Sequence, residues 1–229
     1  MSSTILSTKV LSASQKSLAL NAGLRLVEYN AITVKPLDFK LPKGHYDTLL
    51  FTSQNGVKAY LEYLHALSSN RGKGLEGIRK VFCVGEKTKI LLEDHGFHVM
   101  ASGQDAKALG KIISENYSSH TILWLTGNQR RNELPEILNK KKISFTEVNV
   151  YETVSNPKKI NTDFDGILFF SPSAVLSFAK NNTISGTAFC IGTTTADSVK
   201  KYTENYIIAN KPTIENVLVQ AVKRLNSND

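Results

Sequence analysis

The chain has 229 residues and carries 28 Lys and Arg against 20 Asp and Glu, a formal net charge of +8. Hydrophobic residues make up 41% and charged residues 21%, which excludes a disordered chain and allows one large domain or two small ones. The positive balance favours an anionic partner, which could be nucleic acid, a lipid surface or an acidic small molecule.

Short apolar runs alternate with amphipathic stretches along the whole chain. Ten runs are predicted to be strands, and most are continuously apolar, which is typical of strands buried on both faces of a parallel sheet. In chain order the predicted strands are Thr4–Thr8, Arg25–Tyr29, Asp47–Thr52, Lys80–Val84, His98–Ala101, Thr121–Thr126, Ser144–Val150, Gly166–Phe170, Thr187–Ile191 and Tyr206–Ala209.

Helix patterns lie between these strands. Apolar residues at helical spacing predict helices over Val57–Leu67 and Ile214–Leu225. Ser12 followed by Gln15 forms a capping-box pattern that opens a further helix, which Gly23 closes. The alternation of strands and helices predicts an α/β fold.

The chain also contains an internal repeat. LLFTSQNGVKAY from Leu49 resembles ILFFSPSAVLSF from Ile167, and VFCVGEKTKILL from Val81 resembles AFCIGTTTADSV from Ala188. A third pair is out of order. The segment TILSTKV near the N-terminus resembles TILWLTG in the middle of the chain, and LVEYNAITV resembles VNVYETV.

This permuted order predicts two similar parallel-sheet α/β domains, one of them discontinuous. Domain 1 would comprise residues 1–33 and 156–229, and domain 2 would comprise residues 37–150. The chain leaves the first domain once and returns once, so segments of about 30–37 and 150–157 would form a two-stranded connector. We expect a cleft between the domains to hold the ligand, because domain interfaces are preferred ligand sites.

Small hydroxyl and amide side chains follow several predicted strands. Because parallel sheets present these strand ends and the following helix N-termini to ligands, they are candidate anion sites. Helix capping alone also explains each Ser or Thr, so both interpretations stay open. The four segments are Thr52-Ser53-Gln54-Asn55, Gly127-Asn128, Ser171-Pro172-Ser173 and Gly192-Thr193-Thr194-Thr195.

Other chemical constellations are missing from the sequence. It has no GxGxxG, GxxxxGK[ST], GxSxG or HExxH motif, and its five histidines show no metal-ligand spacing, so we expect no metal. Cys83 and Cys190 occupy matching positions inside predicted strands and are expected to be core thiols. We see neither a secretory leader nor an apolar run long enough for a membrane span.

Tyr151 stands in the second connector, beside the expected cleft. A phenol at this place could donate a proton or a hydrogen bond to a substrate oxygen. Packing of a linker aromatic is the alternative interpretation.

Together, the repeat, its order and the segments FTSQNGV, VGEKT, GNQRRNELPEIL, VYETV, FFSPSAV and IGTTTA resemble the uroporphyrinogen-III synthases over nearly the whole chain. The resemblance implies a bilobed fold on a two-stranded connector. It also implies the closure of hydroxymethylbilane, a linear tetrapyrrole with eight carboxylates, to uroporphyrinogen III. Ring D is inverted, water is lost, and no cofactor is used.

The resemblance also implies roles for individual residues. The connector tyrosine that is thought to help the hydroxyl group leave falls on Tyr151. With the strand-end analysis, it gives a substrate-binding set of Ser53, Asn55, Thr88, Gly127, Asn128, Arg131, Ser171, Ser173, Thr194 and Thr195. Many relatives have Thr-Arg after the first strand, whereas this chain has Thr8-Lys9, and lysine keeps the charge but loses bidentate carboxylate binding.

We therefore expect a cytoplasmic monomer with a small-molecule substrate, no cofactor, no bound nucleic acid and no membrane contact. A transient contact with the preceding enzyme of the haem pathway is a further expectation. The alternative from another functional class is a non-catalytic, two-lobed binder or sensor of an acidic metabolite.

Overall fold

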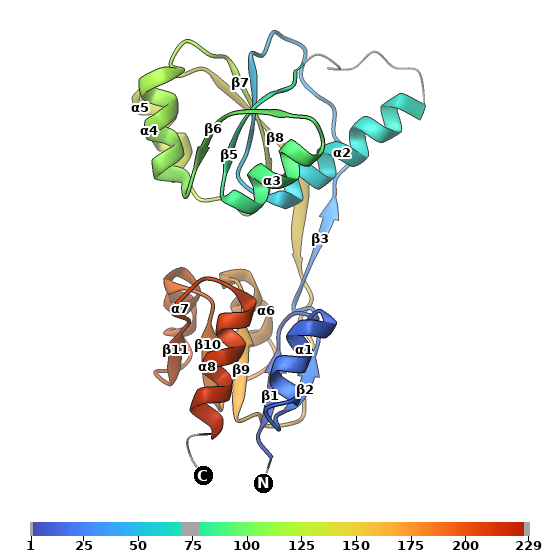
Figure 1. Cartoon of the computed structure of the whole chain (residues 1–229), viewed down its shortest axis with the longest axis vertical. Helices are drawn as coiled ribbons and strands as arrows, with labels where there is room; N and C mark the ends of the chain where they lie inside the picture. The colour runs from blue at the N-terminus through green and yellow to red at the C-terminus, as the bar shows by residue number, and fades with distance from the viewer. Residues whose placement is uncertain (1, 70–77, 227–229) are drawn as a thin grey trace. The chain divides into compact units, whose positions relative to one another are not determined.

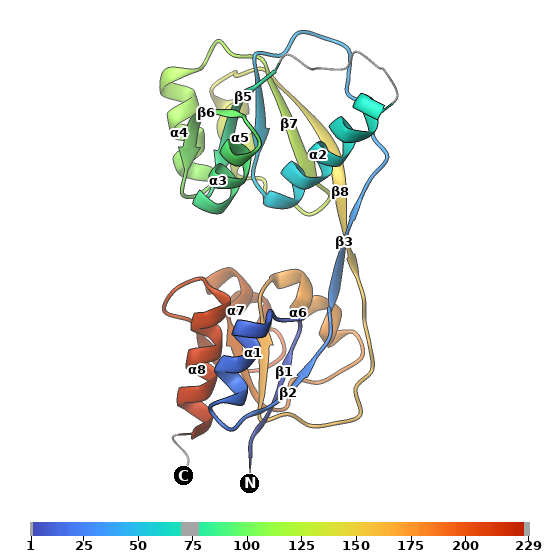
Figure 2. The same cartoon turned by 45° about the vertical axis from the view of Figure 1, so that its right-hand side comes forward.

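The computed structural model describes residues 2–69 and 78–226. Over these ranges the chain divides into two compact units, Met1–Thr33 with Val154–Asp229 (unit 1) and Val34–Thr153 (unit 2). Both units can be followed in Figures 1 and 2. Among the described helices, none is both long and apolar enough to cross a membrane.

Unit 1 is a three-layer α/β unit. In its described part, five parallel strands lie in the order β11-β10-β9-β1-β2. Helices α1 and α8 pack on one face through a cluster that includes Ile5, Leu168 and Phe189. Helices α6 and α7 pack on the other face, against Phe169 and Cys190. The elements are β1 (Thr4–Ser7), α1 (Ala13–Leu20), β2 (Arg25–Glu28), β9 (Gly166–Phe169), α6 (Pro172–Ala179), β10 (Thr187–Cys190), α7 (Thr193–Val199), β11 (Tyr206–Ile208) and α8 (Ile214–Asn226).

Unit 2 repeats this arrangement. Five of its described strands are parallel and lie in the order β8-β7-β4-β5-β6, and β3 lies beside β8 at the edge. Helices α2 and α3 cover one face and α4 and α5 cover the other. The elements are β3 (Ile32–Pro36), β4 (Thr48–Phe51), α2 (Gln54–Ser69), β5 (Lys80–Val84), α3 (Glu86–Asp94), β6 (His98–Gly103), α4 (Ala106–Asn116), β7 (Ile122–Gly127), α5 (Glu133–Lys140) and β8 (Phe145–Ser155).

The sequence repeat is visible in the topology. Strands β1, β2, β9 and β10 of unit 1 occupy the same places in their sheet as β7, β8, β4 and β5 in theirs. The out-of-order pairs of the repeat thus occupy equivalent places in the two sheets. Two parallel-sheet α/β units, one of them discontinuous, confirm the predicted fold class.

Strands β3 and β8 are the two crossings between the units. The Leu37 backbone N–H donates to the Val150 carbonyl at 3.0 Å, and the Asn156 N–H donates to the Ala31 carbonyl at 2.9 Å. Residue numbers rise along the first crossing while those of the bonded residues fall along the second. The two strands are therefore antiparallel. The sequence predicts a strand that ends at Val150 and a connector strand over about 150–157, whereas β8 is a single strand from Phe145 to Ser155.

Local signals explain several helix boundaries. Both hydrogen bonds of the predicted capping box form at α1, from the Gln15 backbone to the Ser12 hydroxyl and from the Ser12 backbone to the Gln15 side chain. Gly23 follows α1 with a φ of +79°, a conformation that suits glycine. Cys83 and Cys190 are both fully buried, as predicted.

Candidate active site

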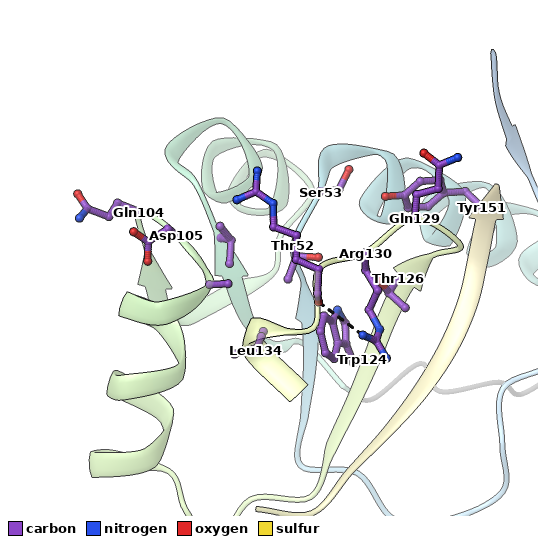
Figure 3. A pocket seen from close by; sticks show the side chains of 13 residues that line it. Thr52, Ser53, Gln104, Asp105, Trp124, Thr126, Gln129, Arg130, Leu134 and Tyr151 are labelled. Carbon is purple, nitrogen blue, oxygen red and sulfur yellow. Dashed lines mark hydrogen bonds between the residues drawn. The ribbon is translucent and has the colours of Figure 1, made fainter. Parts of the chain in front are cut away.

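A pocket of about 390 Å³ opens at the C-terminal edge of the unit 2 sheet. It lies where strands β4, β5, β6 and β7 end and where β8 passes with Tyr151, at the usual ligand side of a parallel sheet. Figure 3 shows Tyr151 and Gln129 at one side, Trp124 with Arg130 in the middle, and Gln104 with Asp105 at the other side. The lining residues are Thr52, Ser53, Val84, Gln104, Asp105, Ala106, Trp124, Thr126, Gln129, Arg130, Arg131, Leu134 and Tyr151.

Helix N-termini border this pocket. Helix α2 begins just after Ser53, whose hydroxyl accepts a hydrogen bond from the Asn55 backbone at 3.1 Å. Helix α4 begins after Asp105, whose carboxylate accepts from the Ala108 N–H at 2.8 Å. These side chains satisfy some of the free N–H groups, and the positive ends of the helix dipoles face the same edge. The pocket is therefore suited to anionic groups.

Tyr151 reaches the pocket from a β-bulge in β8. The pairing of β7 with β8 shifts between Thr126 and Gly127, so that Gly127 lies opposite Tyr151 and not Val150. Val150 and Tyr151 consequently belong to the same hydrophobic cluster, although successive residues of a regular strand point to opposite faces. Only 9% of Tyr151 is exposed, and that part faces the pocket.

Arg130 is held firmly at the pocket wall. Its guanidinium donates from Nε to one oxygen of Glu147 at 2.6 Å and from an Nη to the other at 2.9 Å, a bidentate ion pair. The other Nη donates to the Asn132 side chain at 2.9 Å. The guanidinium carbon lies 5.4 Å from the ring centre of Trp124. These contacts hold the Arg130 guanidinium in place, and the neighbouring Arg131 is exposed and also lines the pocket.

Of the predicted site residues in unit 2, the pocket brings together Ser53, Arg131 and Tyr151. Asn55 lies in the first turn of α2 and is half-buried. Thr88 lies in the first turn of α3 and is 95% buried. Gly127 and Asn128 lie beside the pocket but contact β8, as described below.

The predicted residues of unit 1 lie at the equivalent edge of its own sheet. The Ser171 hydroxyl caps α6 by accepting from the Ala174 N–H at 3.2 Å, and it lies 3.0 Å from the Ser173 hydroxyl. Capping therefore accounts for Ser171, as the alternative interpretation held. Thr194 is exposed at the start of α7, whereas Thr195 is almost completely buried.

Sequence reasoning missed several pocket residues. Gln104 and Asp105 follow β6 directly, and the strand-end argument would have found them if the predicted strand had extended to Gly103. Trp124 belongs to an apolar run and gave no sign of lining a site. Its indole N–H is buried without a hydrogen-bond partner.

The described residues contain no group of three or more His, Cys, Asp or Glu side chains that could hold a metal ion. The two thiols are also poor ligands, because burial raises the pKa of Cys190 to about 12 and also raises the pKa of Cys83.

Comparison with known proteins identifies related sequences and folds. The family model for uroporphyrinogen-III synthase HemD matches residues 14–218. The porphyrin biosynthesis protein HemD of Ruminiclostridium josui is 29% identical over 222 residues, which cover 86% of this chain and 43% of that protein. The chain thus spans less than half of that curated relative.

Two solved structures share the fold. The uroporphyrinogen-III synthetase of Helicobacter pylori superposes with a TM-score of 0.75 at 21% identity, over 98% of this chain and all of the other. A mutant uroporphyrinogen III synthase of Thermus thermophilus superposes with a TM-score of 0.68 at 15% identity, over the full length of both chains.

Proposed function

The chain belongs to the uroporphyrinogen-III synthase family, and we propose that it closes hydroxymethylbilane to uroporphyrinogen III, inverting ring D and releasing water. The observation that carries the proposal is the meeting of the Tyr151 phenol, the Arg131 guanidinium and the Ser53 hydroxyl in one pocket at the ligand side of a sheet. A proton donor and anion-binding groups are what this substrate requires.

In the first step, the carbon–oxygen bond of the hydroxymethyl group breaks while the adjacent pyrrole nitrogen supplies electrons, which gives an azafulvene. We assign to Tyr151 the hydrogen bond or proton that lets the hydroxyl group leave as water. Ring D then attacks through its substituted carbon, and the resulting spiro intermediate opens and recloses in the inverted orientation. The loss of water balances the overall reaction, so no oxidant or reductant is consumed.

The remaining groups bind and orient the substrate. Arg131, Ser53, Asn55, Ser173 and Thr194 would contact its carboxylates, together with the N-terminal N–H groups of the neighbouring helices. Because the hydroxyl is a labile leaving group, holding the chain in the folded geometry is the larger part of catalysis.

The same proposal includes a monomeric, cytoplasmic enzyme that acts without nucleic acid or membrane. Hydroxymethylbilane also cyclises by itself to the symmetric isomer I. A transient contact with the enzyme that supplies it would shorten the time in which that side reaction occurs.

The test of this proposal is the Tyr151→Phe variant. General-acid assistance accelerates a reaction by about 10²–10⁴-fold. Because the hydroxyl is a labile leaving group, we expect the rate of isomer III formation to fall by about a hundredfold or less. Isomer I should accumulate in proportion. The variant is given freshly prepared hydroxymethylbilane, and the oxidised porphyrin isomers are separated by chromatography.

Tyr117→Phe is the matched control. It also removes a phenol from unit 2, but that phenol donates to the Met100 carbonyl at 3.1 Å, and Tyr117 caps the C-terminal end of α4, far along the helix from the pocket. Isomer III should remain dominant in the control. Full activity of Tyr151→Phe would reduce Tyr151 to a packing residue.

A further inference from the structure

The ring of Tyr151 lies directly on Gly127. A Cβ atom built on Gly127 would stand 2.4 Å from two carbons of this ring, Cε2 and Cζ, and 2.9 Å from Cε1. Real Cβ atoms are not found at such distances, so any side chain at position 127 must displace the ring or the strand. Glycine is therefore required here for close approach and not for backbone conformation.

The β-bulge explains why the two residues meet. Without the shift after Thr126, Gly127 would lie opposite Val150. The extra residue turns the Tyr151 ring over the vacant Cβ position of Gly127 and aims its phenol at the pocket. Bulges commonly re-aim a side chain beside an active site.

Asn128 and Gln129, which follow Gly127, hydrogen-bond to the β8 backbone at Tyr151 and Thr153. The Asn128 side-chain oxygen accepts from the Thr153 N–H at 2.9 Å, and its side-chain nitrogen donates to the Thr153 carbonyl at 3.5 Å. The Asn128 backbone N–H donates to the Tyr151 carbonyl at 3.4 Å, and the Gln129 side chain donates to the Thr153 carbonyl at 3.3 Å. Asn128 thus mimics a further strand residue and extends the β7–β8 pairing beyond its end.

We propose that Gly127 and Asn128 are positioning residues for the Tyr151 phenol and not ligands of the substrate. This inference rests on the catalytic role proposed for Tyr151. The hydrogen-bonding groups of Asn128 are directed to β8, and Gly127 has only its backbone to offer. Both residues act on the substrate through the place and the angle of the phenol.

A double-mutant cycle tests the proposal. The variants are Gly127→Ala, Asn128→Ala, Tyr151→Phe, and each of the first two combined with the third. We expect Gly127→Ala to lose most of what Tyr151→Phe loses in rate and in the ratio of isomer III to isomer I. The combined variants should match Tyr151→Phe alone within about twofold, since a misplaced phenol and an absent phenol have the same consequence.

Asn116→Ala is the control for Asn128→Ala, because the Asn116 side chain also donates to a backbone carbonyl, that of Ile112 at 3.1 Å, on an exposed face of α4. Thermal unfolding of every variant separates misplacement of the phenol from loss of the fold. Asn128→Ala leaves the glycine contact intact, so it keeps the test decisive if Gly127→Ala does not fold.

The outcomes separate the two proposals. A folded wild-type chain that forms no uroporphyrinogen III overturns the proposed function. If the wild type is active and Tyr151→Phe is slow, two results overturn only the positioning role: Gly127→Ala and Asn128→Ala variants that keep isomer III dominant, or losses that multiply with that of Tyr151→Phe.

Discussion

The ion pair between Arg130 and Glu147 should stabilise unit 2 well beyond a typical surface pair, and Glu147→Gln is the change that tests it. The pair is bidentate, and the two side chains are only 28% and 26% exposed. Glutamine keeps the shape and one acceptor oxygen but turns an NH₂ group toward the guanidinium donors. Arg130 would then lie over Trp124 with one lost partner.

The expected magnitude follows from this geometry. A hydrogen bond to a charged group contributes about 1.5–3 kcal/mol when buried, whereas an exposed ion pair contributes about 0–1 kcal/mol. The partial exposure of the pair places the loss in unfolding free energy at about 1–2 kcal/mol. The matched control is Glu115→Gln, which breaks an exposed pair with Lys111 at 3.9 Å within one helix and should cost no more than about 0.5 kcal/mol.

Urea unfolding measured by tryptophan fluorescence is the assay. Trp124 is the only tryptophan of the chain and lies in unit 2 beside Arg130, so its emission reports on the unit that is perturbed. In 1 M salt, the loss of unfolding free energy caused by Glu147→Gln should fall by a smaller fraction than the loss caused by Glu115→Gln, because partly buried charges are screened less. A loss of unfolding free energy for Glu147→Gln no larger than that for Glu115→Gln would show that the Arg130–Glu147 pair contributes no more than an exposed pair.

Three further predictions concern binding, reactivity and pH. Ser53→Ala and Ser173→Ala should each weaken substrate binding by about 1 kcal/mol, or about fivefold in KM, because backbone donors remain; a hundredfold loss in kcat would show a catalytic role instead. Burial raises the pKa of Cys190 to about 12, so mass spectrometry should find it unmodified by iodoacetamide at pH 8 unless the chain is unfolded, and rapid labelling of the native protein would contradict this. The Thr121 backbone N–H donates to the Asp47 carboxylate and lowers its pKa below 3.8. The stability that this bond gives the folded protein should therefore be present above the unfolded-state pKa and be lost as the pH falls through the folded-state pKa. Acid unfolding of Asp47→Asn should therefore show a stability deficit at pH 7 that closes below about pH 4, and a deficit independent of pH would count against the assignment.

The fold could be predicted from the sequence because its central strands are buried on both faces. Runs such as Leu49–Phe51 and Ile167–Phe169 are apolar at every position, and their short length favours buried strands over helices. The repeat then supplied the long-range information that a single pattern lacks, since matching segments must occupy matching places in their sheets.

The length of β8 was not predictable in the same way. Residues beyond Val150 are more polar and look like a linker, yet they stay in a strand because β3 pairs with them. That pairing joins segments more than a hundred residues apart. The bulge that places Tyr151 opposite Gly127 has no local sequence signature either, and it decides which side chain enters the pocket.

The candidate site was predicted in part for a related reason. The strand-end rule finds residues by their neighbourhood in the chain, and it located Ser53, whereas Tyr151 was found from its place in the connector and Arg131 from the family resemblance. It does not reveal hydrogen-bond partners. Arg130 and Arg131 are adjacent and chemically identical, and the sequence does not show that Glu147 on β8 pairs with Arg130. Nor does it reveal that the Asn128 side chain hydrogen-bonds to the Thr153 backbone.

Product analysis with freshly prepared hydroxymethylbilane shows directly whether this chain forms uroporphyrinogen III. The wild-type chain is added to the substrate, the products are oxidised, and the porphyrin isomers are separated beside a sample without protein. We expect isomer III to dominate with the protein and isomer I to dominate without it. Isomer I alone, formed at the uncatalysed rate in the presence of the folded chain, would show that the chain is not a uroporphyrinogen-III synthase.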